Sequence, residues 1–317
     1  MRIAFLGKGG SGKTTMAAAF ATYLHENKKL TLLVDADINA HINSLIGIED
    51  TKLKPISKIT SQIIDYVKGS RIDVKDIPFI SHVPPSKQSR FITLKYNDEF
   101  LNQNVVSNVE GLRLMTIGTY EDSDVGFTCY HSKIDSFVIF LNHLLDKSDE
   151  YLVVDSVTGV DNLGNSLIFS YDLNVILVEP NYKSIEVYNN FVEGVRRLDF
   201  PVNVCVIGNK VETKHDRDLI LNSIKNDKHL IGFVSKSNKL KLVDQGNKMY
   251  FKEFIYENSN VFDQVLKTLD SIQRDWDIYL KNIRSSFSYM ARNYYNQYYG
   301  IDLESKIDNS FSFKDVI

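Results

Sequence analysis

The chain opens with Met1-Arg-Ile-Ala-Phe-Leu-Gly7 and continues with Lys8-Gly-Gly-Ser-Gly-Lys-Thr-Thr15. The apolar run 2–6 predicts a short strand, and the good helix formers between 14 and 24 predict a helix. Between them, the pattern G-x-x-x-x-G-K-[ST] is filled by Gly7, Gly12, Lys13 and Thr14. A strand, a glycine loop and a helix in this order indicate a phosphate-binding loop.

The loop has the chemistry that an anion requires. Glycines allow backbone N–H groups to turn towards the anion, and the positive end of the helix adds about half an elementary charge. Lys13 is expected to reach the β- and γ-phosphates of a nucleotide, and the Thr14 hydroxyl to face Mg²⁺. The alternative is a flexible Gly-Ser turn with a chance lysine, which the flanking patterns disfavour. The expected phosphate-binding residues are Gly9, Gly10, Ser11, Gly12, Lys13, Thr14 and Thr15.

Composition limits the class of protein. The chain has 317 residues and a formal net charge of −3, so it can form a large core and shows no basic bias towards nucleic acid. No apolar stretch approaches the roughly 18 residues of a transmembrane segment, and no signal peptide precedes the glycine loop. The two cysteines, Cys129 and Cys205, are too few for a disulfide scaffold, which favours a cytoplasmic protein.

Two further predicted strands end in carboxylates. One apolar run ends in Asp35-Ala-Asp37, and the run 151–155 ends in Asp155. The carboxyl ends of parallel strands border the crevice in which α/β sheets bind ligands. These carboxylates therefore face the expected ligand. A competing interpretation makes Asp35 or Asn39 the N-cap of the next helix.

Strand and helix patterns alternate up to about residue 235, which predicts an α/β fold with a doubly wound, mainly parallel sheet flanked by helices. Beyond about residue 257, apolar residues recur every three or four positions. This predicts one long amphipathic helix, or two helices broken near Ser285-Ser286. We expect 1–257 to form a nucleotide-binding domain and 258–317 a helical C-terminal extension. The tyrosine-rich segment Tyr289–Tyr299 is a candidate surface for a partner or a second copy.

The loop contains a second lysine, Lys8, five positions before Lys13. K-G-G-x-G-K-T-T resembles the deviant Walker A motif of a P-loop ATPase superfamily. That superfamily includes the Min and Par positioning ATPases, the nitrogenase iron protein and metal-insertion ATPases. The resemblance implies a homodimer closed by ATP, in which Lys8 reaches the partner's phosphates. The residues alone show only a second cation beside the loop.

The same resemblance implies roles for the carboxylates. Asp37 matches the switch I aspartate, which positions Mg²⁺ and the attacking water. Asp155, followed by Ser-Val-Thr-Gly159, matches a Walker B strand with the D-x-x-x-G spacing of switch II. Asp155 would then hold Mg²⁺ through water, and the Gly159 N–H would approach the γ-phosphate. The implied catalytic residues are Lys8, Lys13, Asp37 and Asp155, and those around Mg²⁺ are Thr14, Asp37 and Asp155.

The nucleotide base is less clearly specified. Asn209 and Lys210 follow a predicted strand where this superfamily reads the base edge, and an amide can pair with adenine. The string Asn-Lys-Val-Glu212 comes close to the guanine-reading N-K-x-D, but its fourth residue is Glu. ATP is the preferred nucleotide, and GTP stays open. Many relatives have a Pro and an Asp at a position that reads Ser235-Lys-Ser-Asn238 here.

The stretch from Gly118 to Gly164 resembles the carbon monoxide dehydrogenase maturation ATPases, with a likeness over roughly residues 1–250. In that family, a Cys-x-Cys loop from each of two copies binds nickel or zinc. Here the loop reads Cys129-Tyr130-His131. Two thiolates and two imidazoles would form a tetrahedral set that suits Zn²⁺ better than it suits Ni²⁺. The alternative is a remnant of ancestry that binds no metal.

Two functions follow from these patterns. One is a slow, partner-stimulated, Mg²⁺-dependent ATPase that serves as a metallochaperone for a metalloenzyme. The other is a nucleotide-dependent switch that binds a protein partner or a surface through its dimer face and aromatic tail, without binding metal. Uptake of Zn²⁺ or Ni²⁺ that depends on Cys129 would distinguish them.

Overall fold

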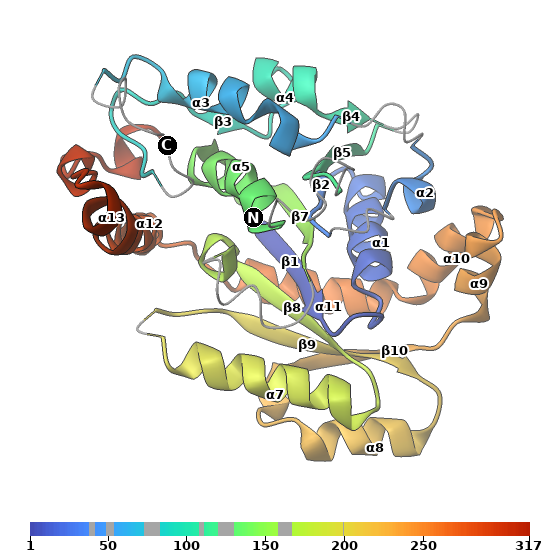
Figure 1. Cartoon of the computed structure of the whole chain (residues 1–317). Helices are drawn as coiled ribbons and strands as arrows, with labels where there is room; N and C mark the ends of the chain where they lie inside the picture. The colour runs from blue at the N-terminus through green and yellow to red at the C-terminus, as the bar shows by residue number, and fades with distance from the viewer. Residues whose placement is uncertain are drawn as a thin grey trace. The chain divides into compact units, whose positions relative to one another are not determined.

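The computed structural model describes residues 1–37, 42–48, 54–72, 83–107, 111–119, 130–157, 167–198 and 200–317. The chain forms two compact units and passes between them several times (Figure 1). The first unit is drawn from residues 1–53, 105–119 and 147–273. The second unit is drawn from residues 54–104, 120–146 and 274–317.

A sheet forms the centre of the first unit, with eight strands in the described part of the chain. Its strand order is β10-β9-β8-β1-β7-β2-β5-β4, and all neighbouring pairs are parallel except β4 and β5. Most of these strands are near-continuous apolar runs, as expected where helices cover both faces of a parallel sheet. The strands are β1 (Arg2–Gly7), β2 (Leu30–Asp35), β4 (Val106–Ser107), β5 (Arg113–Thr116), β7 (Glu150–Asp155), β8 (Leu173–Val178), β9 (Val204–Val211) and β10 (Leu230–Ser235).

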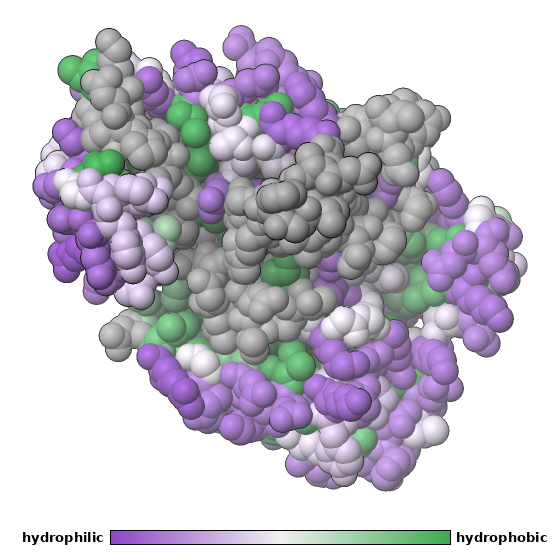
Figure 2. Space-filling model, viewed as in Figure 1, coloured by the Kyte–Doolittle hydropathy of each residue, from purple (hydrophilic) through white to green (hydrophobic). Residues whose placement is uncertain are grey.

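Helices cover the sheet on both faces. Aromatic side chains of α1, α10 and α11, including Phe20, Phe254 and Phe262, share one buried core with the strands. On the other side of β8, β9 and β10 lie α7 and α8, whose outward side chains are mainly hydrophilic (Figures 1 and 2). The helices are α1 (Lys13–Glu26), α2 (Ile42–Ile46), α7 (Tyr182–Arg196), α8 (Lys214–Ser223), α9 (Asn238–Asp244), α10 (Met249–Glu257) and α11 (Ser259–Asp270), with 3₁₀ turns η3 (Leu167–Ser170) and η4 (Asp227–His229).

The second unit is mainly helical. A two-stranded parallel sheet joins β3 and β6, and the Tyr279 hydroxyl donates to the Leu141 carbonyl over 2.9 Å. Phe311 and Phe313 pack into a buried cluster with Tyr279 and Ile283. The elements are η2 (Ile56–Ile59), α3 (Thr60–Lys68), β3 (Ile92–Thr93), α4 (Glu99–Asn104), α5 (Tyr130–Asn142), β6 (Leu144–Leu145), α12 (Trp276–Met290), the π-helix η5 (Ala291–Asn296), α13 (Gln297–Tyr299), η6 (Glu304–Lys306) and η7 (Phe313–Asp315).

The doubly wound, mainly parallel fold is confirmed, but the C-terminal helices differ from the prediction. The apolar stripe breaks between Asp270 and Trp276, and α12 continues through Ser285 and Ser286. Asp275 starts the new helix, since its carboxylate accepts from the N–H groups of Asp277 and Ile278. The expected break near residues 285–286 is therefore wrong.

The expected domain boundary after residue 257 lies inside the first unit. The Phe262 ring of α11 is fully buried, with its centroid 5.7 Å from that of Phe20 and 5.4 Å from that of Tyr23 on α1. The Tyr23 hydroxyl also donates to Asp263 over 2.6 Å. This packing joins residues 258–273 to the sheet, and only the residues from 274 onward belong to the second unit.

Candidate functional site

The glycine loop joins β1 to α1 at the carboxyl edge of the sheet. The Ser11 N–H donates to the Lys8 carbonyl over 3.0 Å, with Gly10 at φ 79°, and Gly12 at φ 94° precedes the helix. These left-handed conformations favour glycine. Gly7 must lack a side chain because a Cβ there would lie 2.7 Å from the backbone carbonyl oxygen of Leu177 on β8. The backbone conformation of the loop therefore explains why glycine occupies these positions.

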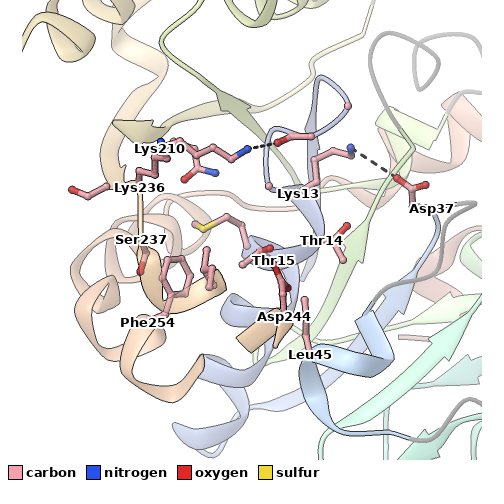
Figure 3. Close-up of a pocket in the computed structure, with 17 residues that line it drawn as sticks. Lys13, Thr14, Thr15, Asp37, Leu45, Lys210, Lys236, Ser237, Asp244 and Phe254 are labelled. Atoms are coloured by element: carbon pink, nitrogen blue, oxygen red, sulfur yellow. Dashed lines mark hydrogen bonds and ion pairs between the residues drawn. The ribbon is translucent and has the colours of Figure 1, made fainter. Parts of the chain in front are cut away.

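A cavity of about 630 Å³ opens over this loop (Figure 3). Its volume lies within the range of roughly 300–1,000 Å³ that small-molecule sites occupy. The residues that line it and were predicted from the sequence to bind ligand are Gly9, Gly10, Gly12, Lys13, Thr14, Thr15, Asp37, Asn209 and Lys210. The rest of its wall comprises Met16, Leu45, Ser235, Lys236, Ser237, Leu240, Asp244 and Phe254.

Lys13 is the buried cation of the cavity. Its side chain is only 4% exposed, and its Nζ lies 3.9 Å from the Asp37 carboxylate (Figure 3). The Ser11 hydroxyl oxygen is buried beside the loop without a hydrogen-bond partner among the described residues. The buried Lys13 ammonium can be attracted to a phosphate that enters the loop.

Asp35 and Asp155 occupy paired positions on the neighbouring strands β2 and β7. Both side chains are almost completely buried. The Asp35 carboxylate accepts from the N–H groups of Asp37 and Ile42, over 3.3 and 3.4 Å. Neither oxygen of Asp155 accepts a hydrogen bond of normal geometry within the described part of the chain. The sequence placed Asp35 at the carboxyl end of its strand, either facing the ligand or capping the next helix, but it did not predict the pairing with Asp155.

The burial of this pair changes its acidity. Burial raises the pKa of Asp155 well above its ordinary value, and the Asp35 carboxylate raises it further, although Thr14 and Lys13 lower it. Burial also raises the pKa of Asp35 to about 7. Hydrogen bonds from the N–H groups of Ile42 and Asp37 oppose this effect and lower the pKa. The buried Asp155 carboxylate and the Thr14 hydroxyl beside it offer oxygen ligands of the kind that Mg²⁺ prefers.

Asn209 and Lys210 lie beside the loop, and each donates a hydrogen bond to it. The Asn209 amide nitrogen donates to the Ser11 carbonyl over 2.7 Å, and the Lys210 ammonium donates to the Gly10 carbonyl. The Lys210 ammonium also lies 2.8 Å from the Glu179 carboxylate. One N–H of the Asn209 amide is therefore bound to the loop, while the amide carries a second N–H and a carbonyl oxygen, so its role at the base edge stays a prediction. Sequence reasoning missed the ion pair with Glu179.

Lys8 lies at the start of the loop and is half-buried. Its carbonyl accepts the turn hydrogen bond from Ser11. Its ammonium forms no ion pair with another residue that the structure describes. The role of Lys8 across a dimer stays a prediction.

Several predicted site residues lie outside the described ranges. These include Gly159 and Cys129, and the N-cap candidate Asn39 also lies outside those ranges. His131 is in the first turn of α5, but its side chain is not described. Across the described residues, no group of three or more His, Cys, Asp or Glu side chains could hold a metal ion. Cys205 is buried in β9, which raises the pKa of its thiol.

The apolar part of the cavity wall was not predicted. Met16, Leu45, Leu240 and Phe254 come from the four helices α1, α2, α9 and α10. Each of these residues fits an amphipathic helix, so the sequence gives no sign that they meet. Only the packing of the first unit brings them to one cavity.

A family model described as the CobQ/CobB/MinD/ParA nucleotide binding domain matches residues 3–249. The carbon monoxide dehydrogenase accessory protein CooC of Rhodospirillum rubrum is 27% identical over 249 residues, which cover 77% of this chain and 87% of that protein. In the described residues, no helix is long and apolar enough to cross a membrane.

Two solved structures show the same fold. A ParA family ATPase from Chlorobium tepidum gives a TM-score of 0.56 at 13% identity, covering 84% of this chain and 96% of that one. The MinC:MinD cell division protein complex of Aquifex aeolicus gives a TM-score of 0.55 at 18% identity, covering 86% of this chain and 98% of that one.

Proposed function

Because the chain belongs to the CobQ/CobB/MinD/ParA nucleotide-binding domain family, we propose that it is a Mg²⁺-dependent, ATP-hydrolysing homodimeric switch. Within this class we assign it to metalloenzyme maturation, as a metallochaperone. The observation that supports this assignment is its similarity to the carbon monoxide dehydrogenase accessory protein, which covers 77% of this chain. We place this activity in the cytoplasm, in accordance with the scarcity of cysteines.

The chain's own residues would act on ATP as follows. N–H groups of the loop, residues 9–15, bind phosphate oxygens, and Lys13 leaves Asp37 to neutralise the terminal phosphates. Thr14, Asp37 and Asp155 would hold Mg²⁺, and Asp37 would orient the attacking water. When bound, Mg²⁺ supplies positive charge that offsets the charge of the transferring phosphoryl group. Turnover is expected to be slow without a partner.

Two further assignments rest on the sequence pattern. Lys8 would complete the phosphate site of a second copy, which makes the homodimer dependent on ATP. Cys129 and His131 would bind Zn²⁺ or Ni²⁺ together with the same two residues of that copy. The metal here is cargo for delivery to a client enzyme.

A second function is favoured by one feature of the second unit. Tyr289, Tyr298 and Tyr299 are each more than 60% exposed. Exposed tyrosines are enriched at protein interfaces. A nucleotide-dependent switch that binds a protein partner there, without metal, would use the same ATP site.

One set of purified variants tests both functions. Wild type, Cys129→Ala and Cys205→Ala are analysed for bound Zn²⁺ and Ni²⁺ and for dimer formation, with and without ATP. Lys13→Ala is expected to abolish binding of Mg²⁺-ATP by calorimetry, and unchanged affinity would contradict the phosphate-loop assignment.

Metal carried by wild type and Cys205→Ala, but lost in Cys129→Ala, supports the metallochaperone. Cys205→Ala is the matched control because it removes the other thiol, which is buried. Equal metal content in all three proteins contradicts the Cys129 site. An ATP-dependent dimer that carries no metal supports the partner-binding switch.

A further inference from the structure

Two consecutive residues of β9 donate to consecutive peptides of the glycine loop. The Asn209 amide donates to the Ser11 carbonyl. The Lys210 ammonium donates to the Gly10 carbonyl (Figure 3). Successive side chains of a strand normally point to opposite faces. Both can reach one loop here because Lys210 has a φ of 58°, in the left-handed region.

This backbone conformation has a cost. A left-handed residue other than glycine is strained and persists where its surroundings determine it. The surroundings of Lys210 are its two partners, the Gly10 carbonyl and the Glu179 carboxylate at 2.8 Å. The strained residue therefore lies where its side chain can connect the loop to β8.

Glu179 follows β8, the strand between β1 and β9. Its side chain is 15% exposed, against 42% for Lys210. Its backbone N–H donates to the Ser184 hydroxyl over 3.0 Å, at the start of α7. The Glu179 backbone is thus held by its own turn, and its carboxylate lies where it can position the Lys210 ammonium.

The two loop bonds determine the direction of backbone donors. In a planar trans peptide, the C=O and the following N–H point in opposite directions. A bond from Asn209 to the Ser11 carbonyl therefore turns the Gly12 N–H away from Asn209. A Cβ on Gly12 would lie only 2.6 Å from the Asn209 amide nitrogen, so this contact is also a reason for glycine at position 12.

We propose that Asn209, Lys210 and Glu179 form a clamp that orders the glycine loop before nucleotide arrives, with Glu179 as a positioning residue that acts through Lys210. The proposal rests on the proposed function, because the ordered loop is the one that would bind the phosphates. Glu179 itself does not line the cavity among the residues described there.

The first test measures the loop without nucleotide. Amide hydrogen exchange is followed at residues 9–12 in wild type, Glu179→Gln and Lys210→Met. Both variants should exchange several-fold faster there than wild type, because the loop carbonyls lose their fixed donors. The matched control is Glu193→Gln. Glu193 pairs with Lys225 over the same distance of 2.8 Å, at an exposed site outside the loop. Loop exchange unchanged in both clamp variants would refute the clamp.

The second test measures ADP affinity by calorimetry. Lys210→Met should weaken binding about tenfold, since a hydrogen bond from a charged donor is lost. Glu179→Gln should weaken it about two- to fivefold, because the pair is partly exposed to solvent. Glu193→Gln should leave it unchanged. Wild type that binds no nucleotide would overturn the proposed function, while the exchange measurement would still decide the clamp.

A charge swap separates positioning from simple stabilisation. Glu179→Lys combined with Lys210→Glu can restore the ion pair and the thermal stability, but a carboxylate at position 210 cannot donate to the Gly10 carbonyl. The clamp predicts that the loop still exchanges fast in the double variant. Recovery of wild-type exchange and affinity in that variant would show that the pair is only structural.

Discussion

At the scale of single residues, the site contains two carboxylates that have been removed from water at paired positions of β2 and β7. Asp155 has no hydrogen-bond donor of normal geometry among the described residues, whereas Asp35 has two backbone donors. A protein holds such a pair at a cost in stability, and a bound cation offsets that cost. The same pair should therefore make the metal-free protein sensitive to pH.

We expect the free energy of unfolding without Mg²⁺ to fall as the pH rises from about 4 to about 7. The pKa of Asp35 is raised from its ordinary value of 3.8 to about 7, so the folded protein binds more protons than the unfolded chain in this window. The stabilisation is fully present below the ordinary pKa of 3.8 and is lost as the pH rises through the folded-state pKa of about 7. The expected slope is about 1.4 kcal/mol per pH unit for one such group.

Urea unfolding of wild type and Asp35→Asn in chelator, at about pH 5 and about pH 7, measures this slope. The variant should lose less stability between the two conditions. The variant lacks the Asp35 carboxyl that titrates in this window. The Asp155 carboxyl also no longer has a charged carboxylate beside it. Identical losses in the two proteins would contradict the assigned pKa shift.

At the scale of elements, α11 is part of the sheet unit, although its sequence resembles that of the helices after it. Three of its side chains, Phe262, Val265 and Leu269, are buried in the core that α1 shares with the strands. Beyond α11, Asp275 starts α12, which belongs to the second unit. The turn 271–275 is thus the boundary that the packing defines.

Phe262→Ala should reduce the free energy of unfolding by about 3–5 kcal/mol, because it leaves a cavity between α11 and the α1 rings of Phe20 and Tyr23. Tyr256→Ala is the matched control, since that aromatic side chain on α10 is 82% exposed. It should change stability by less than about 0.5 kcal/mol. Equal losses of unfolding free energy in Phe262→Ala and Tyr256→Ala, measured by denaturant unfolding, would contradict the assignment of α11 to the core of the first unit.

At the scale of the whole molecule, the proposed switch requires a second copy of the chain. Lys8→Ala should still bind nucleotide, because Lys13 and the loop N–H groups remain, but it should not dimerise with ATP. A charge-assisted phosphate contact contributes about 1.5–3 kcal/mol, and a symmetric dimer has two. Their loss would weaken association by about two to four orders of magnitude.

Sedimentation with a non-hydrolysable ATP analogue measures this, with Lys29→Ala as the control for an exposed lysine outside the loop. The control should dimerise as wild type does. A Lys8→Ala protein that dimerises equally well would remove Lys8 from the interface and, with it, the argument for a site shared between copies.

The sequence by itself determined the parts of this protein that depend on local chemistry. The glycine loop could be read from residues 7–15, because left-handed turns and close backbone approach leave few choices besides glycine. The order of the strands and helices followed from apolar runs and periodicity. Asp37 and Asp155 could be placed at the carboxyl edge because they end or follow predicted strands.

Only the tertiary structure decided which of these elements meet. Strand register places Asp35 beside Asp155. Folding also brings Asn209 and Lys210 into hydrogen bonds with loop carbonyls about 200 residues earlier in the chain. It also built the apolar wall of the cavity from four helices and joined α11 to the sheet. These contacts are non-local. An amphipathic pattern shows that a helix face is buried, but it does not show which other face buries it.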